Sequence, residues 1–163
     1  MARLVLSDTS PLIALSLIGR LDLLSALFGE ITITDVVRAE LLAGGDRPGQ
    51  AAIAAAIREK HVRVIGESKK EPLFLVLDEG EASTLRAAIQ HDGPCLVLID
   101  ERAGRAVAAE YGIAHTGTVG VILQAKKRAL IPSARTVFAE LLTQDFRIAA
   151  GLMREALARV GEE

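Results

Sequence analysis

Short apolar segments alternate with longer helical patterns along most of this 163-residue chain. The strand-like segments are residues 4–6, 31–33, 62–65, 95–99 and 113–115. Between them, apolar residues recur every three or four positions, as they do in amphipathic helices. Because strands separated by helices usually become parallel neighbours, this order predicts an α/β fold whose mainly parallel sheet is covered on both faces.

The last part of the chain has no further strand pattern and is predicted to be helical. Thr118 can cap one helix and Pro132 can open a second. A last amphipathic helix is marked by Phe146, Ala149, Met153, Leu157 and Val160. A chain of this length can bury a core without disulfides. We therefore expect residues 1–163 to form a single domain, with C-terminal helices from about 132 to 160.

Composition and charge limit the cellular compartment and the classes of partner that we expect for the protein. The chain has 19 Lys and Arg against 21 Asp and Glu, so its formal charge of −2 would not attract nucleic acid, and a polyanion would need a local basic patch or a bound cation. No apolar run approaches the roughly 18 residues of a membrane span. The single Cys95 lies in an apolar run, which suits a reducing compartment. We expect a cytoplasmic protein with no membrane partner.

Two of the predicted strands end in an aspartate. Asp8 follows the first strand and Asp100 follows the fourth. Ligands bind at the carboxyl ends of strands in parallel α/β sheets, because the loops diverge there and leave a crevice. The structural alternative is that each aspartate caps the helix it precedes, although Ser10 is also a competent cap for the first helix.

Two further groups of acids lie on predicted helices. Glu40 follows Val36 and Val37 by four and three residues, so it lies on or beside the apolar face and either reaches solvent or has a partner. Asp78 and Glu81 have the Asp-x-x-Glu spacing of a capping box, so Glu81 also has a purely structural alternative.

Carboxylates gathered at one sheet edge repel one another and raise one another's pKa values unless a cation neutralises them. Carboxylate oxygens suit Mg²⁺ or Mn²⁺, which commonly serve phosphate chemistry. The three histidines share no ligand spacing, and one cysteine cannot form a thiolate site, so zinc is not expected.

Four segments, in their order and spacing, resemble the PIN-domain family. They are Asp8-Thr9-Ser10-Pro11-Leu12-Ile13, Val37-Arg38-Ala39-Glu40-Leu41, Leu77-Asp78-Glu79-Gly80-Glu81-Ala82 and Ile99-Asp100-Glu101 with Arg105. The similarity is closest to a prokaryotic PIN-like branch associated with VapC-type toxins, which Gly117-Thr118-Val119-Gly120 also resembles. The resemblance implies a three-layer α/β/α fold and a metal-dependent endoribonuclease that acts on single-stranded RNA as the toxin of a toxin-antitoxin pair.

The resemblance also implies roles for individual residues. The catalytic and metal-binding acids would be Asp8, Glu40, Glu81 and Asp100. They would hold Mg²⁺ or Mn²⁺, with Ser10 forming hydrogen bonds near the metal, and an antitoxin protein would be a partner. Arg102 and Arg105 begin the helix after Asp100, where they could bind flanking phosphates or simply form a solvated helix face.

Two other functions compete with the nuclease. A strand that ends in Asp with hydroxyls nearby also describes an aspartyl phosphotransferase, although Ser10 stands where one form of that class needs a second Asp. The other is a non-catalytic PIN-like module that docks RNA or a protein partner.

The last helix adds an expectation about partners. Ile148, Leu152 and Ala156 form one apolar row, and a second row lies beside it. Because this face is wider than one packing surface requires, it predicts contact with a second copy or an antitoxin, the alternative being a helix folded wholly onto its own core.

Overall fold

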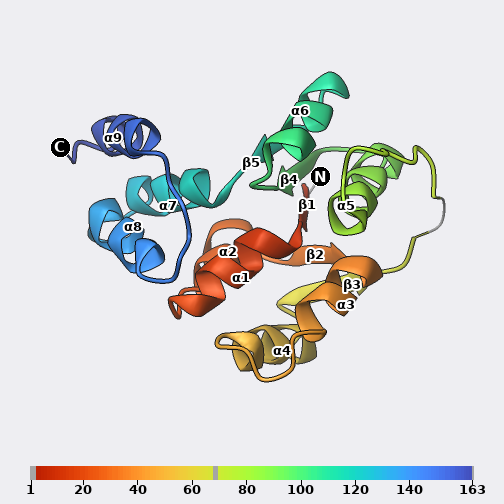
Figure 1. Cartoon of the computed structure of the whole chain (residues 1–163), viewed down its shortest axis with the longest axis horizontal. Coiled ribbons are helices and arrows are strands. Elements are labelled where there is room, and N and C mark those ends of the chain that lie inside the picture. Colours follow the sequence, from red (N-terminus) through yellow and green to blue (C-terminus); the bar gives the residue numbers. More distant parts are fainter. Residues whose placement is uncertain (1–2, 68–69, 163) are drawn as a thin grey trace.

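A computed structural model describes residues 3–67 and 70–162, and in them five strands form one sheet flanked by helices (Figure 1). The strands are β1 (Leu4–Ser7), β2 (Ile31–Thr34), β3 (Val62–Ile65), β4 (Cys95–Leu98) and β5 (Ala114–Thr116). Their order is β3-β2-β1-β4-β5, and every pairing between neighbours is parallel. The predicted α/β/α fold with a mainly parallel central sheet is confirmed.

Helices connect the strands and form the C-terminal part of the molecule. They are α1 (Thr9–Leu17), α2 (Asp22–Phe28), α3 (Asp35–Leu42), α4 (Gln50–Arg58), α5 (Glu79–Gln90), α6 (Arg102–Glu110), α7 (Thr118–Lys127), α8 (Ala134–Leu142) and α9 (Ala150–Arg159). Figure 1 shows α7, α8 and α9 together at one end of the molecule, away from α5. In the part of the chain that the structure describes, no helix is both long enough and apolar enough to cross a membrane.

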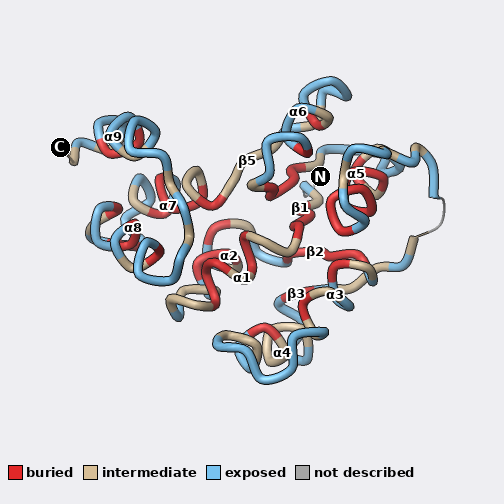
Figure 2. Tube along the Cα trace, in the orientation of Figure 1, coloured by how far each residue is buried: buried red, intermediate tan, exposed pale blue. Residues whose placement is uncertain are grey.

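The two faces of the sheet belong to two separate apolar clusters. Along β1, Val5 packs in the larger cluster with residues of α1, α2 and α7, whereas Leu6 packs in the smaller cluster with residues of α5 and α6. Val97 and Leu98 of β4 divide between the clusters in the same way. This alternation follows from the two-residue period of a strand. Figure 2 shows the resulting burial of β1 and β2 between the helical layers.

The strand order places the ends of β1 and β4 side by side. The chain builds β1, β2 and β3 outward in one direction and then returns to add β4 and β5 on the other side of β1. Ser7 pairs with Leu98 at the carboxyl ends, and the Asp8 backbone N–H donates to the Leu98 carbonyl at 2.9 Å. The crevice where the strand order reverses, which is the usual ligand position in such sheets, therefore lies between these two strands.

Four predicted helix starts are wrong. Helix α7 begins at Thr118 with Gly117 in the N-cap position, so Thr118 is not its cap. Helix α9 begins at Ala150, so Phe146 lies outside it. Helix α1 begins at Thr9 with Asp8 in the N-cap position, so Ser10 lies inside the first turn and is not the cap. Pro11 is tolerated there because the first backbone N–H groups of a helix have no helical acceptor. Helix α8 begins after Ser133, whose side chain accepts a hydrogen bond from Thr136 N–H at 3.1 Å, and not at Pro132.

Candidate active site

A cleft of about 370 Å³ opens at the carboxyl edge of the sheet. Six acids line it: Asp8, Glu40, Asp78, Glu81, Glu101 and Asp145. The described residues that line this cleft include no lysine or arginine. We call it the acidic cleft. The uncompensated charge makes it costly for the folded protein, so the positions of the individual carboxylates decide what the cleft can bind.

Asp8 lines the acidic cleft and is only 4% exposed. Burial raises the pKa of its carboxyl from 3.8 to about 7; the Thr9 backbone N–H opposes the rise, and the charges of Asp78 and Glu40 add to it. Although Asp8 is in the N-cap position of α1, its side chain makes no capping hydrogen bond there. The alternative that Asp8 serves only as a helix cap is therefore not supported.

Glu81 lies in the first turn of α5 and is 5% exposed. Asp78 is the cap of this helix, because its side chain accepts a hydrogen bond from Glu81 N–H at 2.8 Å. Burial, followed by repulsion from Asp78 and Asp8, raises the pKa of the Glu81 carboxyl to about 7. Half of the predicted capping box is thus present, while the Glu81 carboxyl itself lines the acidic cleft with Asp8.

Glu40 has a specific partner, as its place beside the apolar face of α3 suggested. The Thr9 hydroxyl donates to Glu40 Oε2 at 2.6 Å. The carboxylate also lies close over Gly80 of α5, where a Cβ atom would be 2.5 Å from Oε2 and 2.7 Å from Oε1. Gly80 is therefore the residue that lets Glu40 reach the start of α5.

Asp100 is held against α7 and not against the helix that follows it. Its Oδ1 accepts a hydrogen bond from Thr118 N–H at 2.7 Å, and its Oδ2 accepts from the hydroxyls of Thr118 at 2.7 Å and Ser10 at 3.0 Å. Glu101, not Asp100, occupies the N-cap position of α6. The side chain of Ser10 thus serves Asp100 from a distance of 90 residues in the sequence.

The two predicted phosphate-binding arginines differ in position. Both are exposed on α6. Arg105 lines a second cleft that also contains Asp100, whereas Arg102 is the first residue of the helix and lines neither this cleft nor the acidic one.

The donor chemistry of the acidic cleft fits a divalent cation. Hard carboxylate oxygens are the ligands of Mg²⁺ and Mn²⁺. Burial, and to a smaller extent repulsion from neighbouring acids, raises the pKa values of Asp8 and Glu81, and a bound cation would offset the cost of ionising them. Over residues 3–67 and 70–162, however, no three acids, histidines or cysteines are grouped closely enough to form a complete metal site. Mg²⁺ itself is commonly held by one or two carboxylates and several waters.

The arrangement of sheet, helices and acids agrees with one family model. The model described as PIN domain matches residues 4–162. The chain belongs to the PIN-domain family. PIN domains are generally nucleases and typically use divalent metal ions. No curated protein matched the chain.

Several residues of this PIN domain were not identified from the sequence. Asp145 enters the acidic cleft from the segment between α8 and α9, and Glu101 enters it from the start of α6. Gly80 and Thr118 position Glu40 and Asp100. Glu101 and Thr118 lie in segments that resemble the family, but their own roles were not predicted. Gly80 carries a local signal, since a glycine in the first turn of a helix, where most residues are tolerated, suggests a close approach by another group.

Proposed function

We propose that this PIN domain is a metal-dependent endoribonuclease that acts on single-stranded RNA and is the toxin of a toxin-antitoxin pair. The observation that carries the proposal is the pair of buried carboxyls, Asp8 and Glu81, in a cleft lined by six acids and, among the described residues, by no basic side chain. The resemblance of residues 8–13 and 117–120 to the VapC-associated branch supports the toxin role.

In this proposal, Asp8 and Glu81 are the direct ligands of Mg²⁺ or Mn²⁺, and Glu40 and Asp100 complete the site directly or through water. A divalent cation supplies a water of lowered pKa and stabilises the charge that develops on the phosphoryl group. The chain supplies the orientation: Thr9 holds Glu40, while Ser10 and Thr118 hold Asp100. No side-chain nucleophile is required.

Cleavage of single-stranded RNA in the presence of Mn²⁺ tests the proposal. Asp8→Asn keeps the shape of the side chain but removes a charged ligand, so cleavage should fall by at least about a hundredfold while the circular dichroism spectrum is retained. Asp92→Asn is the matched control, since Asp92 is exposed in the segment before β4 and lines neither cleft. Equal cleavage by the wild type and Asp8→Asn would overturn the assignment.

Glu81→Gln separates the catalytic and structural roles of this residue. Its backbone N–H already binds Asp78, and Gln leaves that bond intact. A structural role therefore predicts unchanged cleavage, whereas a charged ligand predicts a large loss of cleavage in a folded protein.

One observation favours the alternative of a non-catalytic module that docks RNA or a protein partner. Within the described part of the chain no three potential ligands are grouped into a complete metal site. A wild type that binds RNA, does not cleave it and gains no stability from Mn²⁺ would select this alternative.

The proposed protein partners, an antitoxin and a possible second copy, stay predictions. Ala156 and Leu157 of α9 are buried against the body of the protein, so part of the predicted apolar face is used internally. Leu152 is 46% exposed and remains available for contact with another chain. Figure 2 shows most of α9 as exposed.

A further inference from the structure

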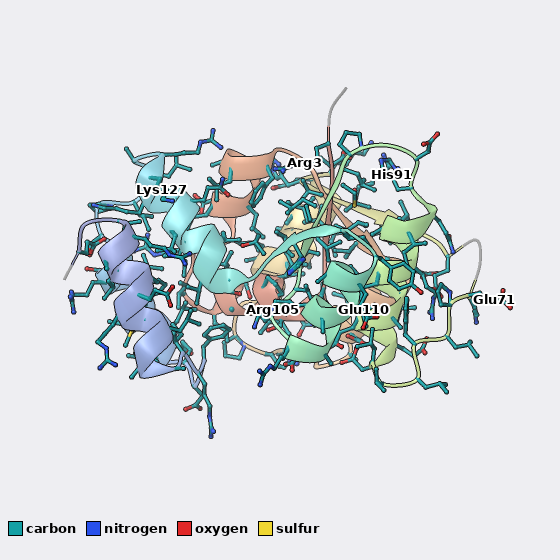
Figure 3. All side chains as sticks on the ribbon, turned by 90° about the horizontal axis from the view of Figure 1, so that it is seen from above. Arg3, Glu71, His91, Arg105, Glu110 and Lys127 are labelled. Atoms are coloured by element: carbon teal, nitrogen blue, oxygen red, sulfur yellow. The ribbon has the colours of Figure 1, made fainter. Side chains whose placement is uncertain are left out.

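A second cleft of about 480 Å³ lies next to the acidic cleft. It is enclosed by α6, β5, the start of α7, the segment 146–149 and α9. We call it the basic cleft, because its lining includes Arg105, His115, Arg147 and Arg159. In Figure 3, Arg105 lies on the side of α6 that faces α7 and α9.

The two clefts adjoin at two points. Phe146 lines both of them. Ser10 of the acidic cleft donates its hydrogen bond to Asp100, which lines the basic cleft. A ligand that passes from one cleft to the other would therefore cross the Ser10–Asp100 pair beside the Phe146 ring.

The charges of the two clefts are opposite in kind. The basic cleft holds three arginines against Asp100 and Glu155, and Arg159 is already paired with Glu155 at 2.9 Å. Over the part of the chain that the structure describes, Arg105 and Arg147 form no ion pair. Their guanidinium groups remain available to an anion that enters the basic cleft.

A single-stranded nucleic acid has the chemistry that both clefts require. Its phosphate at the acidic cleft can approach only with a cation, whereas a neighbouring phosphate can bind guanidinium groups directly through charge-assisted hydrogen bonds. Aromatic side chains bind single strands by stacking on a base, whatever its identity. Phe146 is partly buried at the junction of the clefts, which fixes its ring where a base next to the reacting phosphate would lie.

We propose that the basic cleft binds the RNA strand on one side of the phosphate that is cleaved. Arg105 and Arg147 bind backbone phosphates, and Phe146 stacks against a base at the junction. This assignment rests on the proposed ribonuclease function and extends it to a binding path. It adds Arg147 and Phe146 to the residues that the sequence identified.

Binding can be measured by fluorescence anisotropy with a labelled single-stranded RNA of about 12 nucleotides. The buffer contains Ca²⁺ in place of Mg²⁺ or Mn²⁺, and the measurement is repeated at several salt concentrations. Gels run in parallel show that the RNA is intact. Arg105→Gln and Arg147→Gln should each weaken affinity by about tenfold and reduce the slope of log affinity against log salt by roughly 0.7 for each lost phosphate contact. Arg154→Gln is the matched control, because Arg154 is exposed on α9 and does not line the cleft.

Phe146→Leu tests the stacking contact separately. It keeps an apolar side chain in the partly buried position but removes the aromatic face. We expect affinity to fall by about tenfold with an unchanged salt slope, because no charge is lost. The melting temperature identifies a variant that binds weakly only because it is unfolded.

The outcomes separate this inference from the proposed function. If the wild type cleaves RNA and Asp8→Asn does not, but Arg105→Gln and Arg147→Gln bind as Arg154→Gln does, the binding path is wrong and the ribonuclease stands. If the wild type neither binds nor cleaves single-stranded RNA, the proposed function fails first. Weaker binding and a smaller salt slope in the two cleft variants alone would support the path.

Discussion

Replacing Asp8 by Asn should stabilise the metal-free protein, even though it removes a residue of the proposed metal site. The Asp8 carboxyl is 4% exposed, and burial raises its pKa from 3.8 to about 7. Each tenfold change in proton affinity corresponds to about 1.4 kcal/mol. A rise of roughly three in the pKa therefore means that the ionised carboxyl lowers the free energy of unfolding by up to about 4 kcal/mol.

The pH dependence follows from the sign of this change. Because the pKa of Asp8 is higher in the folded than in the unfolded protein, the folded protein retains a proton that the unfolded chain releases between about pH 4 and 7. The contribution to stability is thus fully present below about pH 4 and is lost as the pH rises through about 7. Asn cannot ionise, so Asp8→Asn avoids this loss. Its advantage over the wild type should grow with pH.

Urea unfolding in EDTA at about pH 4.5 and about pH 8 measures the effect. Asp8→Asn should exceed the wild type by up to about 4 kcal/mol at the higher pH and by much less at the lower pH. The control Asp92→Asn alters an exposed acid and should change stability little at either pH. The reasoning is refuted if Asp8→Asn is no more stable than the wild type at about pH 8, or if its advantage is the same at both values.

Three further changes have outcomes that the structure specifies. Gly80→Ala would bring a Cβ atom to 2.5 Å from the Glu40 carboxylate, so RNA cleavage should fall by about tenfold or more, with little change in the melting temperature. Gly151→Ala, which meets no atom within 4 Å, should retain cleavage and gain about 0.5–1 kcal/mol in urea unfolding. Arg86→Leu leaves the buried Glu67 carboxylate without its 2.6 Å partner and should cost about 3–5 kcal/mol, and adding Glu67→Leu should recover most of that loss.

The sequence predicted the sheet and its acids because that information is local. A buried parallel strand is a short apolar run, and the residue after it lies at the carboxyl edge whatever the rest of the fold does. Asp8 and Asp100 could be assigned to this edge for that reason. Their proximity depends on β1 and β4 being neighbours, which the strand order decides and no local pattern reveals.

The missed features depend on contacts between distant segments. The local pattern predicted Ser10 as a helix cap, but its hydroxyl donates to Asp100, 90 residues away. Only the resemblance to the PIN-domain family implied hydrogen bonds from Ser10 near the metal. Apolar periodicity placed Phe146 in the last helix, but Phe146 and Arg147 lie in the irregular segment between α8 and α9. Their importance follows only from the clefts they line.

The separation of charge between the two clefts supports the proposal that a cation binds in the acidic cleft. The N-termini of α5 and α7 lie beside acids. A helix N-terminus stabilises a nearby negative charge by only about 0.3–1 kcal/mol. This is well below the roughly 4 kcal/mol that ionisation of Asp8 costs. An arginine in the acidic cleft could supply the difference, yet it would pair with the carboxylates that should bind metal. The arginines that could do so, Arg105 and Arg147, line the neighbouring cleft instead. This separation leaves the acidic charge for the proposed cation and the arginines of the basic cleft for the proposed phosphate contacts.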